Sequence, residues 1–539
     1  MKRLIYISLL FVFLAACVPV PANTPAPATA APTAIPPTQP APAEPPQPWW
    51  RDAVFYEIFV RSFNDSNGDG IGDFNGITQK LDYLKTLGIT AIWLMPIHPS
   101  PSYHGYDVLN FYAVNPQYGS LADFKQLLGA AHAKNIRIII DLVLNHTSAQ
   151  HPIFLDAKSN SQSKYRDWYV WSDTNPGSRW VQAGEAYYYA YFWEGMPDLN
   201  YRNPEVTLQM EKMSAFWLNS VGVDGFRIDA AKHLIEEGDK LENTPATHAW
   251  LQNYYTFYKA ENRDAYVVGE VAGAGGSIAK TYENQMDQIF NFELANAFVN
   301  SSSGGSSSSV VSSYKFALKE KPDGNYATFL TNHDQNRIMS VLNGDENKAK
   351  VAASLLLTGP GTPFIYYGEE IGMQGKKPDE DIRLPMQWTS DLATSGFTSG
   401  QPWRNPGLNT SSMNVTVEIG NSNSLYNHYR ALIALRLQYH ALRTGSVTLL
   451  ETNNPGVFAS LRKQGPETIL VLINLTSKPI SAYKLTLSDS ILTDGQYSPS
   501  VILGPKDDLA ELQVNTGKFS AYQPLPELPP FSTILALIK

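Results

Sequence analysis

The chain is notable first for how little cysteine and concentrated positive charge it contains. Cysteine occurs once among 539 residues, at position 17, so no intramolecular disulfide can form. Lys and Arg number 41 against 50 Asp and Glu, giving a net charge of −9 with no long basic run. Because nucleic-acid binding needs clustered cations to neutralise phosphates, this composition argues against a nucleic-acid partner. The 43% hydrophobic content instead indicates a multidomain globular protein.

The first residues carry an export signal. Lys2 and Arg3 precede the apolar run Leu4 to Ala16, which is too short for a membrane-spanning helix but typical of a signal peptide. The run ends in Leu-Ala-Ala before Cys17, a pattern that resembles the lipobox at which bacterial lipoproteins are cleaved and acylated. We therefore expect residues 1–17 to be a lipoprotein signal peptide, with Cys17 anchoring the protein outside the cell or in the envelope to a bacterial membrane. The alternative is an ordinary signal peptide.

Residues 18–48 are dominated by Pro, Ala and Thr. Such a segment cannot bury enough apolar surface to fold, and its prolines favour an extended polyproline II conformation. We expect it to be a linker between the anchor and the folded part of the chain.

From residue 49 onward, short apolar runs alternate with amphipathic stretches. The helical spacing in Gln79–Leu87 and Ser120–Lys134 predicts helices, and Ser120 with Asp123 forms a capping-box signature. The apolar runs predict eight strands at Ala53–Val60, Ala91–Ile97, Ile136–Asn145, Gly225–Asp229, Tyr266–Glu270, Gln288–Phe292, Thr328–Asn332 and Pro363–Tyr367. Strands and helices in this order predict an α/β fold, a (β/α)8 TIM barrel, which keeps its chemistry at the C-terminal ends of the strands.

Other segments fall outside the barrel repeat. The connection after the third run is far longer than an ordinary loop, so we expect an inserted domain over 146–203 and a barrel over 49–145 and 204–443, ending in a helix at Leu425–Arg443. The Ser-rich tract Asn300–Ser309 is expected to be a flexible loop. A C-terminal antiparallel β-sandwich over 444–539 is predicted from alternating segments at Val457–Arg462, Thr468–Leu475, Tyr483–Leu487 and Thr533–Ile538.

Ionisable side chains follow four of the predicted strands, where a barrel places its active site. A carboxylate beside Val, Ile and Phe is costly to bury unless it is paired or has a function. Asp229, Glu270 and Asp334 suit glycoside chemistry, in which one carboxylate attacks the anomeric carbon, one protonates the leaving oxygen and a third stabilises the distorted sugar. Arg227 shares a strand face with Asp229 and can keep it ionised. A structural role is the alternative for each motif taken singly, but four such motifs together favour a site.

The four strand-end segments resemble the signature regions of the α-amylase family, glycoside hydrolase family 13, and a fifth region matches at Met196–Asn200. The resemblance covers residue 49 to the C-terminus and implies a retaining double displacement, with Asp229 as nucleophile, Glu270 as acid and then base, and Asp334 assisting. It also implies substrate contacts from His104, Tyr106, Asp141, His146, Arg227, Lys232, His233 and His333. For His146 and His333 the alternative is a structural role as buried histidines.

Calcium is the expected metal. Asp65–Asp73 offers oxygen ligands at alternate positions around glycines, as a hard cation such as Ca²⁺ requires, but Gly76 stands where an EF-hand has its Glu. The segment resembles the calcium loop of the oligo-1,6-glucosidase branch, which implies coordination by the side chains of Asp65, Asn67, Asp69 and Asp73 and the carbonyl of Ile71. The alternative is a solvated turn. In typical α-amylases a second site would use Asn145, Asp198 and the backbone of His233.

The features that separate branches of the family are mixed. Arg383–Trp388 and the calcium loop resemble oligo-1,6-glucosidases, Ala230 with Lys232 and His233 resembles α-amylases, and Met196 suits a group between oligo-1,6-glucosidases and neopullulanases. We expect retaining, endo-type hydrolysis of α-1,4 bonds in starch and maltooligosaccharides. The alternative activities are those of a neopullulanase or cyclomaltodextrinase, an oligo-1,6-glucosidase or a transglycosylase. An alternative from another class is a non-catalytic glycan-binding or transporter-associated relative, which the presence of all three carboxylates disfavours. We predict no particular oligomeric state.

Overall fold

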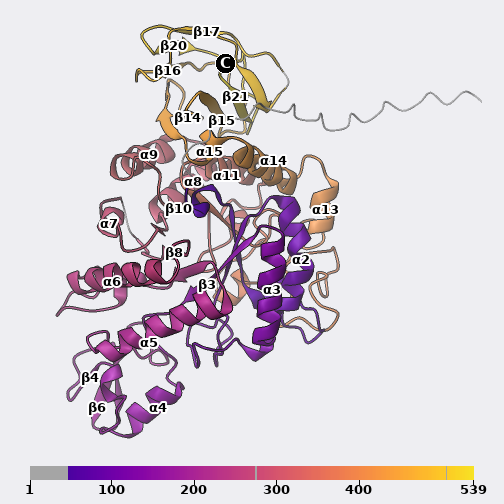
Figure 1. Ribbon diagram of the computed structural model, residues 1–539. Coiled ribbons are helices and arrows are strands. Elements are labelled where there is room, and N and C mark those ends of the chain that lie inside the picture. Colours follow the sequence, from indigo (N-terminus) through magenta and orange to yellow (C-terminus); the bar gives the residue numbers. More distant parts are fainter. Residues whose placement is uncertain (1–46, 274–275, 506) are drawn as a thin grey trace, which may run out of the picture. The chain divides into compact units, whose positions relative to one another are not determined.

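The computed structural model describes residues 47–273, 276–505 and 507–539, which form a barrel with an inserted sheet and a C-terminal β region (Figure 1). The predictions for Cys17, the signal peptide and the linker up to residue 46 lie outside the described residues. Within the described ranges, no helix has the length and apolar character needed to span a membrane.

The barrel consists of eight parallel strands in the order β10-β11-β1-β2-β3-β7-β8-β9, which confirms the predicted fold. A parallel bridge between Phe290 and Ala327 joins the strands at the two ends of this order. Most strands are shorter than predicted, and Asp229 and Glu270 lie just beyond the ends of β7 and β8. Their bounds are β1 (Phe55–Ile58), β2 (Ala91–Leu94), β3 (Arg137–Leu142), β7 (Gly225–Ile228), β8 (Tyr266–Gly269), β9 (Gln288–Ile289), β10 (Ala327–Thr328) and β11 (Thr362–Tyr366).

Helices follow the strands along the chain. The predicted capping box is present, since Ser120 Oγ accepts from the Asp123 backbone N–H at 3.2 Å and the Asp123 carboxylate accepts from the Ser120 N–H at 2.8 Å. The predicted C-terminal helix is interrupted by the extended backbone of Tyr439. The helices are α1 (Val60–Phe63), α2 (Phe74–Leu87), α3 (Leu121–Ala133), α5 (Pro204–Ala215), α6 (Pro245–Glu261), α7 (Gly276–Thr281), α8 (Phe292–Gly304), α9 (Ser308–Glu320), α10 (Ile338–Val341), α11 (Glu346–Thr358), α12 (Asp379–Ile382), α13 (Val415–Gly420), α14 (Leu425–Gln438) and α15 (His440–Arg443).

The Ser-rich tract is not a flexible loop, and that prediction was wrong. It contains the end of α8, a turn at Gly305 and the start of α9. Ser301 and Ser302 are buried, and their hydroxyls are satisfied locally: Ser302 Oγ donates to the Phe298 carbonyl and Ser301 Oγ accepts from the Val310 N–H. Serine composition misled the sequence reading because these short side chains can bond to the backbone of a helix that tertiary packing already holds.

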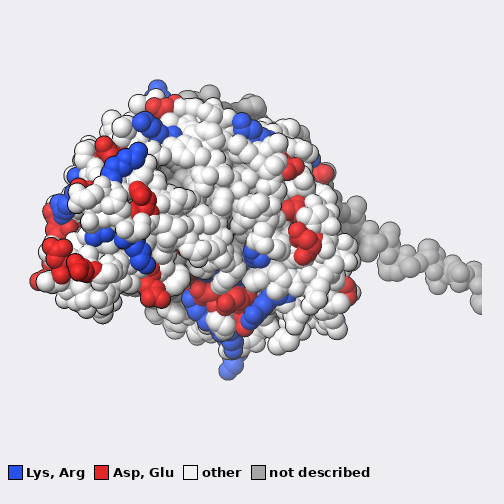
Figure 2. Space-filling view, turned by 90° about the horizontal axis from the view of Figure 1, so that it is seen from below, with Lys and Arg blue, Asp and Glu red and all other residues white. Residues whose placement is uncertain are grey.

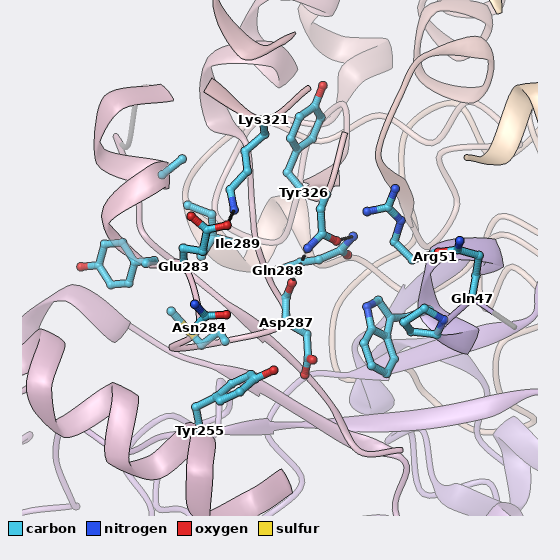
Figure 3. A pocket seen from close by; sticks show the side chains of 16 residues that line it. Gln47, Arg51, Tyr255, Glu283, Asn284, Asp287, Gln288, Ile289, Lys321 and Tyr326 are labelled. Carbon is cyan, nitrogen blue, oxygen red and sulfur yellow. Dashed lines mark hydrogen bonds and ion pairs between the residues drawn. The ribbon is translucent and has the colours of Figure 1, made fainter. Parts of the chain in front are cut away.

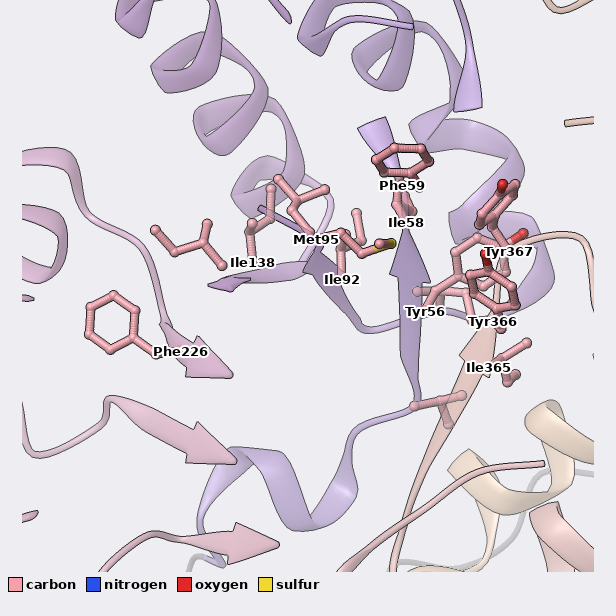
Figure 4. Packing of buried hydrophobic residues seen from close by; sticks show 14 of the residues in the cluster. Tyr56, Ile58, Phe59, Ile92, Met95, Ile138, Phe226, Ile365, Tyr366 and Tyr367 are labelled. Atoms are coloured by element: carbon pink, nitrogen blue, oxygen red, sulfur yellow. The ribbon is translucent and has the colours of Figure 1, made fainter. Parts of the chain in front are cut away.

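Strand residues alternate between the interior of the barrel and the layer beneath the helices. Figure 4 shows the outer layer, in which side chains such as Ile92, Ile138 and Phe226 project from the strands. A separate buried cluster contains the alternate residues, and there Phe55 stacks on Phe364 with ring centroids 4.3 Å apart. By the same period of two, Glu57 of β1 shares the inward face with Phe55.

The inserted segment after β3 contains α4 (Pro152–Ser159) and a small antiparallel sheet in the order β4-β6-β5. Its strands are β4 (Trp171–Ser172), β5 (Trp180–Ala183) and β6 (Ala186–Tyr189). It is tied to the barrel mouth by Asn145, whose carbonyl accepts from the Leu199 N–H at 2.9 Å. The inserted domain after the third barrel strand was therefore predicted correctly.

The C-terminal region contains antiparallel sheets, the largest in the order β12-β14-β15-β21-β18. Leu470 and Leu472 of β15 face the local core, whereas Val471 and Ile473 pack into the cluster that includes the barrel helices. Burial on both faces explains the nearly continuous apolar run of this strand. The strands are β12 (Ser446–Leu449), β13 (Glu451–Thr452), β14 (Val457–Gln464), β15 (Glu467–Asn474), β16 (Leu485–Leu487), β17 (Gly495–Tyr497), β18 (Ser500–Leu503), β19 (Leu512–Val514), β20 (Phe519–Tyr522) and β21 (Thr533–Leu537).

Two glycines provide a matched test of the barrel packing. A Cβ on Gly225, at the start of β7, would lie 1.8 Å from the Tyr266 carbonyl oxygen of β8, whereas a Cβ on Gly129 of α3 would meet no atom within 4 Å. We expect Gly225→Ala to lower Tm markedly, because the two backbones must separate. Gly129→Ala should raise stability by about 0.5–1 kcal/mol, because alanine favours the helix. Thermal unfolding followed by circular dichroism checks both, and equal Tm values for the two variants would contradict this account.

Candidate active site

Two of the predicted catalytic carboxylates stand at adjacent strand ends. Asp229 follows β7 and Glu270 follows β8, and these strands are paired in the barrel. Directly after Asp229 the chain turns sharply, because Ala230 adopts a left-handed backbone with φ of 46°. This uncommon conformation for a residue with a Cβ aims the Ala230 N–H at Glu270 Oε2, 3.3 Å away. The turn therefore positions both carboxylates at the barrel mouth.

Arg227 holds the carboxylates together. Its side chain on β7 is 1% exposed, and Nη1 donates to Asp229 Oδ1 at 2.6 Å while Nη2 donates to Glu270 Oε2 at 2.7 Å. Nη1 also bonds Asp141 at the end of β3, at 2.9 Å. The guanidinium lies 5.1 Å from the centre of the Trp93 ring, which closes the barrel beneath it. One buried cation thus organises carboxylates from three neighbouring strands.

Burial and like charge set the protonation of these carboxyls. Burial raises the pKa of both Asp229 and Glu270, and the charge of Arg227 opposes that rise. Both carboxylates accept a hydrogen bond from Arg227, and the charge of Asp334 raises the pKa of each. Burial also raises the pKa of Asp141, to about 7, against Arg227. Burial thus makes all three carboxyls harder to ionise, and Arg227 opposes this effect at each of them.

His333 forms a second buried ion cluster beside the first. Its Nδ1 lies 2.5 Å from Glu57 Oε1, and its Nε2 lies 2.7 Å from the Tyr106 hydroxyl and 3.3 Å from Asp334 Oδ2. Burial alone would lower the pKa of His333, but Asp334 and Glu57 outweigh it and raise the pKa to about 10. His333 is therefore an imidazolium that donates from both nitrogens, and the Tyr106 hydroxyl passes the chain on to Asp141 at 3.2 Å.

Asp334, the third predicted carboxylate, lines the same cleft as Asp229 and Glu270. Its side chain is 46% exposed, and its Oδ1 accepts from Arg383 Nη2 at 2.9 Å. Burial works against ionisation, but His333 and Arg383 hold the pKa of Asp334 well below its usual range. Asp334 is therefore an ionised, solvent-facing carboxylate, whereas burial raises the pKa of Glu270.

Most of the predicted substrate residues surround one cleft with a volume of about 510 Å³. His104, His146, Lys232 and His233 line it together with Tyr106 and the three carboxylates. Burial lowers the pKa of His146 to about 4, so this ring is neutral. Asp141, Arg227 and His333 lie directly beneath, in contact with the lining residues. The structure thus brings all of the predicted catalytic and substrate residues together.

The sequence reading missed several residues of the cleft. Glu57 and Arg383 orient His333 and Asp334, while Asp379, Phe192 and Trp193 line the cleft. Glu57 carried a signal, since a carboxylate stands inside the apolar run of β1. Arg383 lies in a segment that resembles one branch of the family, but nothing in that segment indicates its contact with Asp334. Phe192 and Trp193 lie in the insert, and no local pattern reveals that the insert folds back onto the mouth of the barrel.

The expected calcium loop is a compact turn packed against residues 398–403. The Asp65 carboxylate accepts from the backbone N–H groups of Asn67, Gly68 and Gly70 and from the Thr398 hydroxyl. Burial would raise the pKa of Asp65, but these donors hold it below its usual value. Asn67, Asp69 and Asp73 also carry side-chain oxygens, the ligand type that Ca²⁺ takes, and here these oxygens accept from the N–H groups of Asp69, Ile71 and Gly76. Within the described ranges no group of three His, Cys, Asp or Glu is arranged as a metal site, and Asp65, Asp69 and Asp73 are among the residues to which this applies.

The second expected calcium site joins the insert to the barrel. Asn145 Nδ2 donates to Asp198 Oδ2 at 2.9 Å, and Asp198 Oδ1 accepts from the Tyr191 N–H at 2.7 Å. Asn145 Oδ1 is buried without a partner, which leaves one oxygen facing this junction. Burial raises the pKa of Asp198 well above its usual value. The amide and carboxyl thus bond to each other, so this site remains a prediction.

A smaller cavity of about 240 Å³ lies at the opposite, N-terminal ends of strands β9 and β10 (Figure 3). Its charged residues are paired with one another or with neighbours: Glu283 with Lys321 at 3.3 Å, and Asp287 with Lys259 at 2.7 Å. These pairs stabilise the bottom of the barrel and leave no convergent carboxylates there. The chemistry of the fold is therefore concentrated in the larger cleft.

A TIM barrel whose strand ends bring three carboxylates around a buried arginine in an open cleft has the architecture of a glycoside hydrolase. Comparison with known families agrees, because residues 57–445 match the model of the alpha amylase catalytic domain. The chain belongs to the α-amylase family, glycoside hydrolase family 13, whose members named below act on α-glucosidic sugars.

Characterised relatives come from both branches discussed above. Alpha-amylase 3 of Dictyoglomus thermophilum is 42% identical, with 80% of this chain and 86% of that protein covered. An oligo-1,6-glucosidase of Heyndrickxia coagulans is 32% identical, with 80% and 93% covered. Among solved structures, an alpha-amylase from H. orenii superposes with a TM-score of 0.78 at 38% identity, covering 90% of this chain and 99% of that one. The chain is therefore an α-glucan hydrolase of this family.

The charged state of His333 predicts a pH dependence of stability. Folding raises the pKa of His333 from 6.5 to about 10, so its stabilising contribution is complete below pH 6.5 and is lost as pH rises through 10. We expect Tm to fall between pH 6.5 and 10, and to fall less steeply in His333→Asn. The control is His151→Asn, because the pKa of His151 is lowered to about 4 and Asn preserves its helix cap. Parallel Tm curves for wild type and His333→Asn would contradict the assignment.

Proposed function

We propose that the protein is a retaining, endo-acting α-amylase that cleaves α-1,4 bonds of starch and maltooligosaccharides. The contacts of Arg227 support the retaining mechanism, because Asp229 and Glu270 bind the two terminal nitrogens of one guanidinium, at 2.6 and 2.7 Å. Such proximity suits a nucleophile and an acid acting on one bond, because inverting enzymes hold their carboxyls further apart to admit a water.

The division of roles between the two carboxylates follows the resemblance of their strand-end segments to the family. Glu270 would protonate the leaving oxygen, and Asp229 would attack the anomeric carbon to form the glycosyl-enzyme, both held by Arg227. Glu270 would then remove a proton from the incoming water. Ionised Asp334 would stabilise the positively charged transition state, aligned by Arg383. A raised pKa of Glu270 places the loss of activity with rising pH above the ordinary glutamic acid value of 4.5.

The preference for α-1,4 chains rests on the relatives and on Lys232 and His233, which resemble the matching residues of α-amylases. Identity is higher to the alpha-amylase of Dictyoglomus than to the oligo-1,6-glucosidase of Heyndrickxia. Lys232 and His233 line the cleft, and Lys232 is held by Glu242 at 2.7 Å and by the Ala272 carbonyl at 2.8 Å. On the face shown in Figure 2, charges of both signs stand in small groups between large uncharged areas, which suits a neutral polymer.

Variants of the two carboxylates test the mechanism. We expect Asp229→Asn to lose about three or more orders of magnitude in activity on both starch and α-glucosyl fluoride, because no glycosyl-enzyme forms. Glu270→Gln should lose a similar factor on starch but should release the first equivalent of fluoride much faster than later ones, because this leaving group needs no proton whereas hydrolysis of the glycosyl-enzyme still lacks its base. Reducing-sugar and fluoride release measure the two reactions.

The matched control is Asp82→Asn, a carboxylate with an 84% exposed side chain on α2. Wild-type rates in Asp229→Asn would refute Asp229 as the nucleophile, and a wild type that releases no sugar from starch would indicate a non-catalytic relative. Products from maltoheptaose and pullulan, compared side by side, separate endo α-1,4 cleavage from neopullulanase or oligo-1,6-glucosidase action. Glucose as the sole early product from maltoheptaose would contradict the endo assignment.

Calcium binding by the Asp65–Asp73 loop is a further part of the proposal. The side chains of Asp65, Asn67, Asp69 and Asp73 and the carbonyl of Ile71 would hold Ca²⁺, which would stabilise the loop without entering the chemistry. We expect EDTA to lower Tm and Ca²⁺ to restore it, since a ligand at 100 times its Kd adds about 2.7 kcal/mol to stability. Asp69→Asn should shrink this difference, and Asp82→Asn should not. An EDTA-insensitive Tm would refute the site.

The location of the enzyme also remains a proposal. The lipobox-like sequence before Cys17 supports a lipid anchor, and residues 18–48 would then act as the tether. Metabolic labelling with a fatty acid, compared between wild type and Cys17→Ser, tests the anchor directly.

A further inference from the structure

Arg383 is the side chain that links Asp334 to the interior of the protein. Its Nη2 donates to Asp334 Oδ1 and its Nε donates to the His333 carbonyl, both at 2.9 Å. The Arg383 side chain is 3% exposed, whereas that of Asp334 is 46% exposed, so the direction of this carboxylate depends on the few groups that bond it. Whatever holds Arg383 in place therefore also positions Asp334.

Trp403 supports Arg383 through two intermediates. The indole Nε1 donates to Ser62 Oγ at 3.0 Å, and Ser62 Oγ in turn donates to the Arg383 carbonyl at 2.5 Å. The indole also stacks on the Tyr103 ring, with centroids 5.6 Å apart, and the Tyr103 hydroxyl lies 3.5 Å from Arg383 Nη1. One tryptophan thus supports the backbone of Arg383 on one side and its guanidinium on the other.

Trp403 is itself fixed by contacts outside the cleft. Its backbone N–H donates to the Gly70 carbonyl at 2.9 Å, and a Cβ on Gly70 would lie 2.0 Å from the Gln401 carbonyl oxygen, so the two segments touch through their backbones. The Phe59 ring meets the indole edge-on, with centroids 6.2 Å apart. Trp403 is not among the residues that line the catalytic cleft, so its place in the site is to hold other groups.

We propose that Trp403 is a positioning residue for the reaction, which acts through Ser62 and Tyr103 to keep Arg383, and with it Asp334, aligned. Asp334 would stabilise charge that develops only in the transition state, so loosening its support should lower kcat much more than it raises KM. The path also joins the Asp65–Asp73 loop to the site, because Gly70 of that loop holds the Trp403 backbone. This inference rests on the role of Asp334 in the proposed function and adds residues outside the cleft that support this role.

A double-mutant cycle on kcat and KM for maltoheptaose tests the path. We expect Trp403→Phe, which loses the indole N–H but keeps a ring against Tyr103, to lower kcat about tenfold with KM changed less than about twofold. Ser62→Ala should lower kcat by at least as much, because it breaks the same chain of hydrogen bonds. The double variant should fall no further than Ser62→Ala alone, since the two side chains act in series. Trp403→Ala, which removes both supports, should fall further than Trp403→Phe.

Trp388→Phe is the matched control. Trp388 is 5% exposed, and its indole Nε1 donates at 2.8 Å to the carbonyl of Phe63, the residue of α1 that follows Ser62. The substitution therefore removes an equivalent hydrogen bond to the same helix without breaking the path to Arg383. We expect it to lower Tm at least as much as Trp403→Phe does, but to leave kcat within about twofold of wild type.

The outcomes separate this inference from the proposed function. Wild-type kcat in both Trp403→Phe and Ser62→Ala, while Asp334→Asn is inactive, overturns the positioning role alone. An equal fall of kcat in Trp388→Phe, or multiplied effects in the double variant, overturns it as well, because general destabilisation or independent contacts would then explain the losses. Should Trp403→Ala fold poorly by Tm, Trp403→Phe and Ser62→Ala carry the test. Wild-type kcat in Asp334→Asn would instead refute the role of Asp334 in the proposed function.

Discussion

The charge of Arg227 is the constraint on which the rest of the site depends. Its guanidinium is buried on β7 and bonds Asp141, Asp229 and Glu270, which come from three paired strands. A buried cation without partners would be prohibitively costly, and the three carboxyls would repel one another without it. The parallel barrel satisfies both demands, because its strand ends bring these side chains to one place. The same ion cluster that stabilises the mouth also sets the protonation that the chemistry needs.

A second ion cluster extends this order around the barrel. Glu57 of β1 fixes the His333 imidazolium, which bonds the Tyr106 hydroxyl, and that hydroxyl bonds Asp141. The chain of contacts connects β1, the loop after β2, the end of β3 and the segment after β10. Because every member is a partner of another, the site is positioned before substrate arrives, and the insert supplies the remaining, exposed wall through Phe192 and Trp193.

The sequence predicted much of the fold and the core of the site, for identifiable reasons. Asp229 and Glu270 were found because a carboxylate at the end of an apolar strand is conspicuous, and Arg227 because strand periodicity places it beside Asp229. Errors arose where local composition does not report tertiary contacts. The tract around Ser302 forms helix because packing and backbone hydrogen bonds override its composition. Strands such as β17 and β19 have three residues each, too few for alternation to identify them.

The sequence by itself determined the strand and helix order, and hence the barrel, because hydrophobic periodicity and caps act within a few residues. It also determined which carboxylates stand at strand ends. Only the tertiary structure decided that Glu57 pairs with His333, that Arg383 holds Asp334, and that the insert sets Trp193 over the cleft. These contacts join residues far apart in the chain, and their geometry depends on how the strands close and the loops pack, which no local pattern specifies.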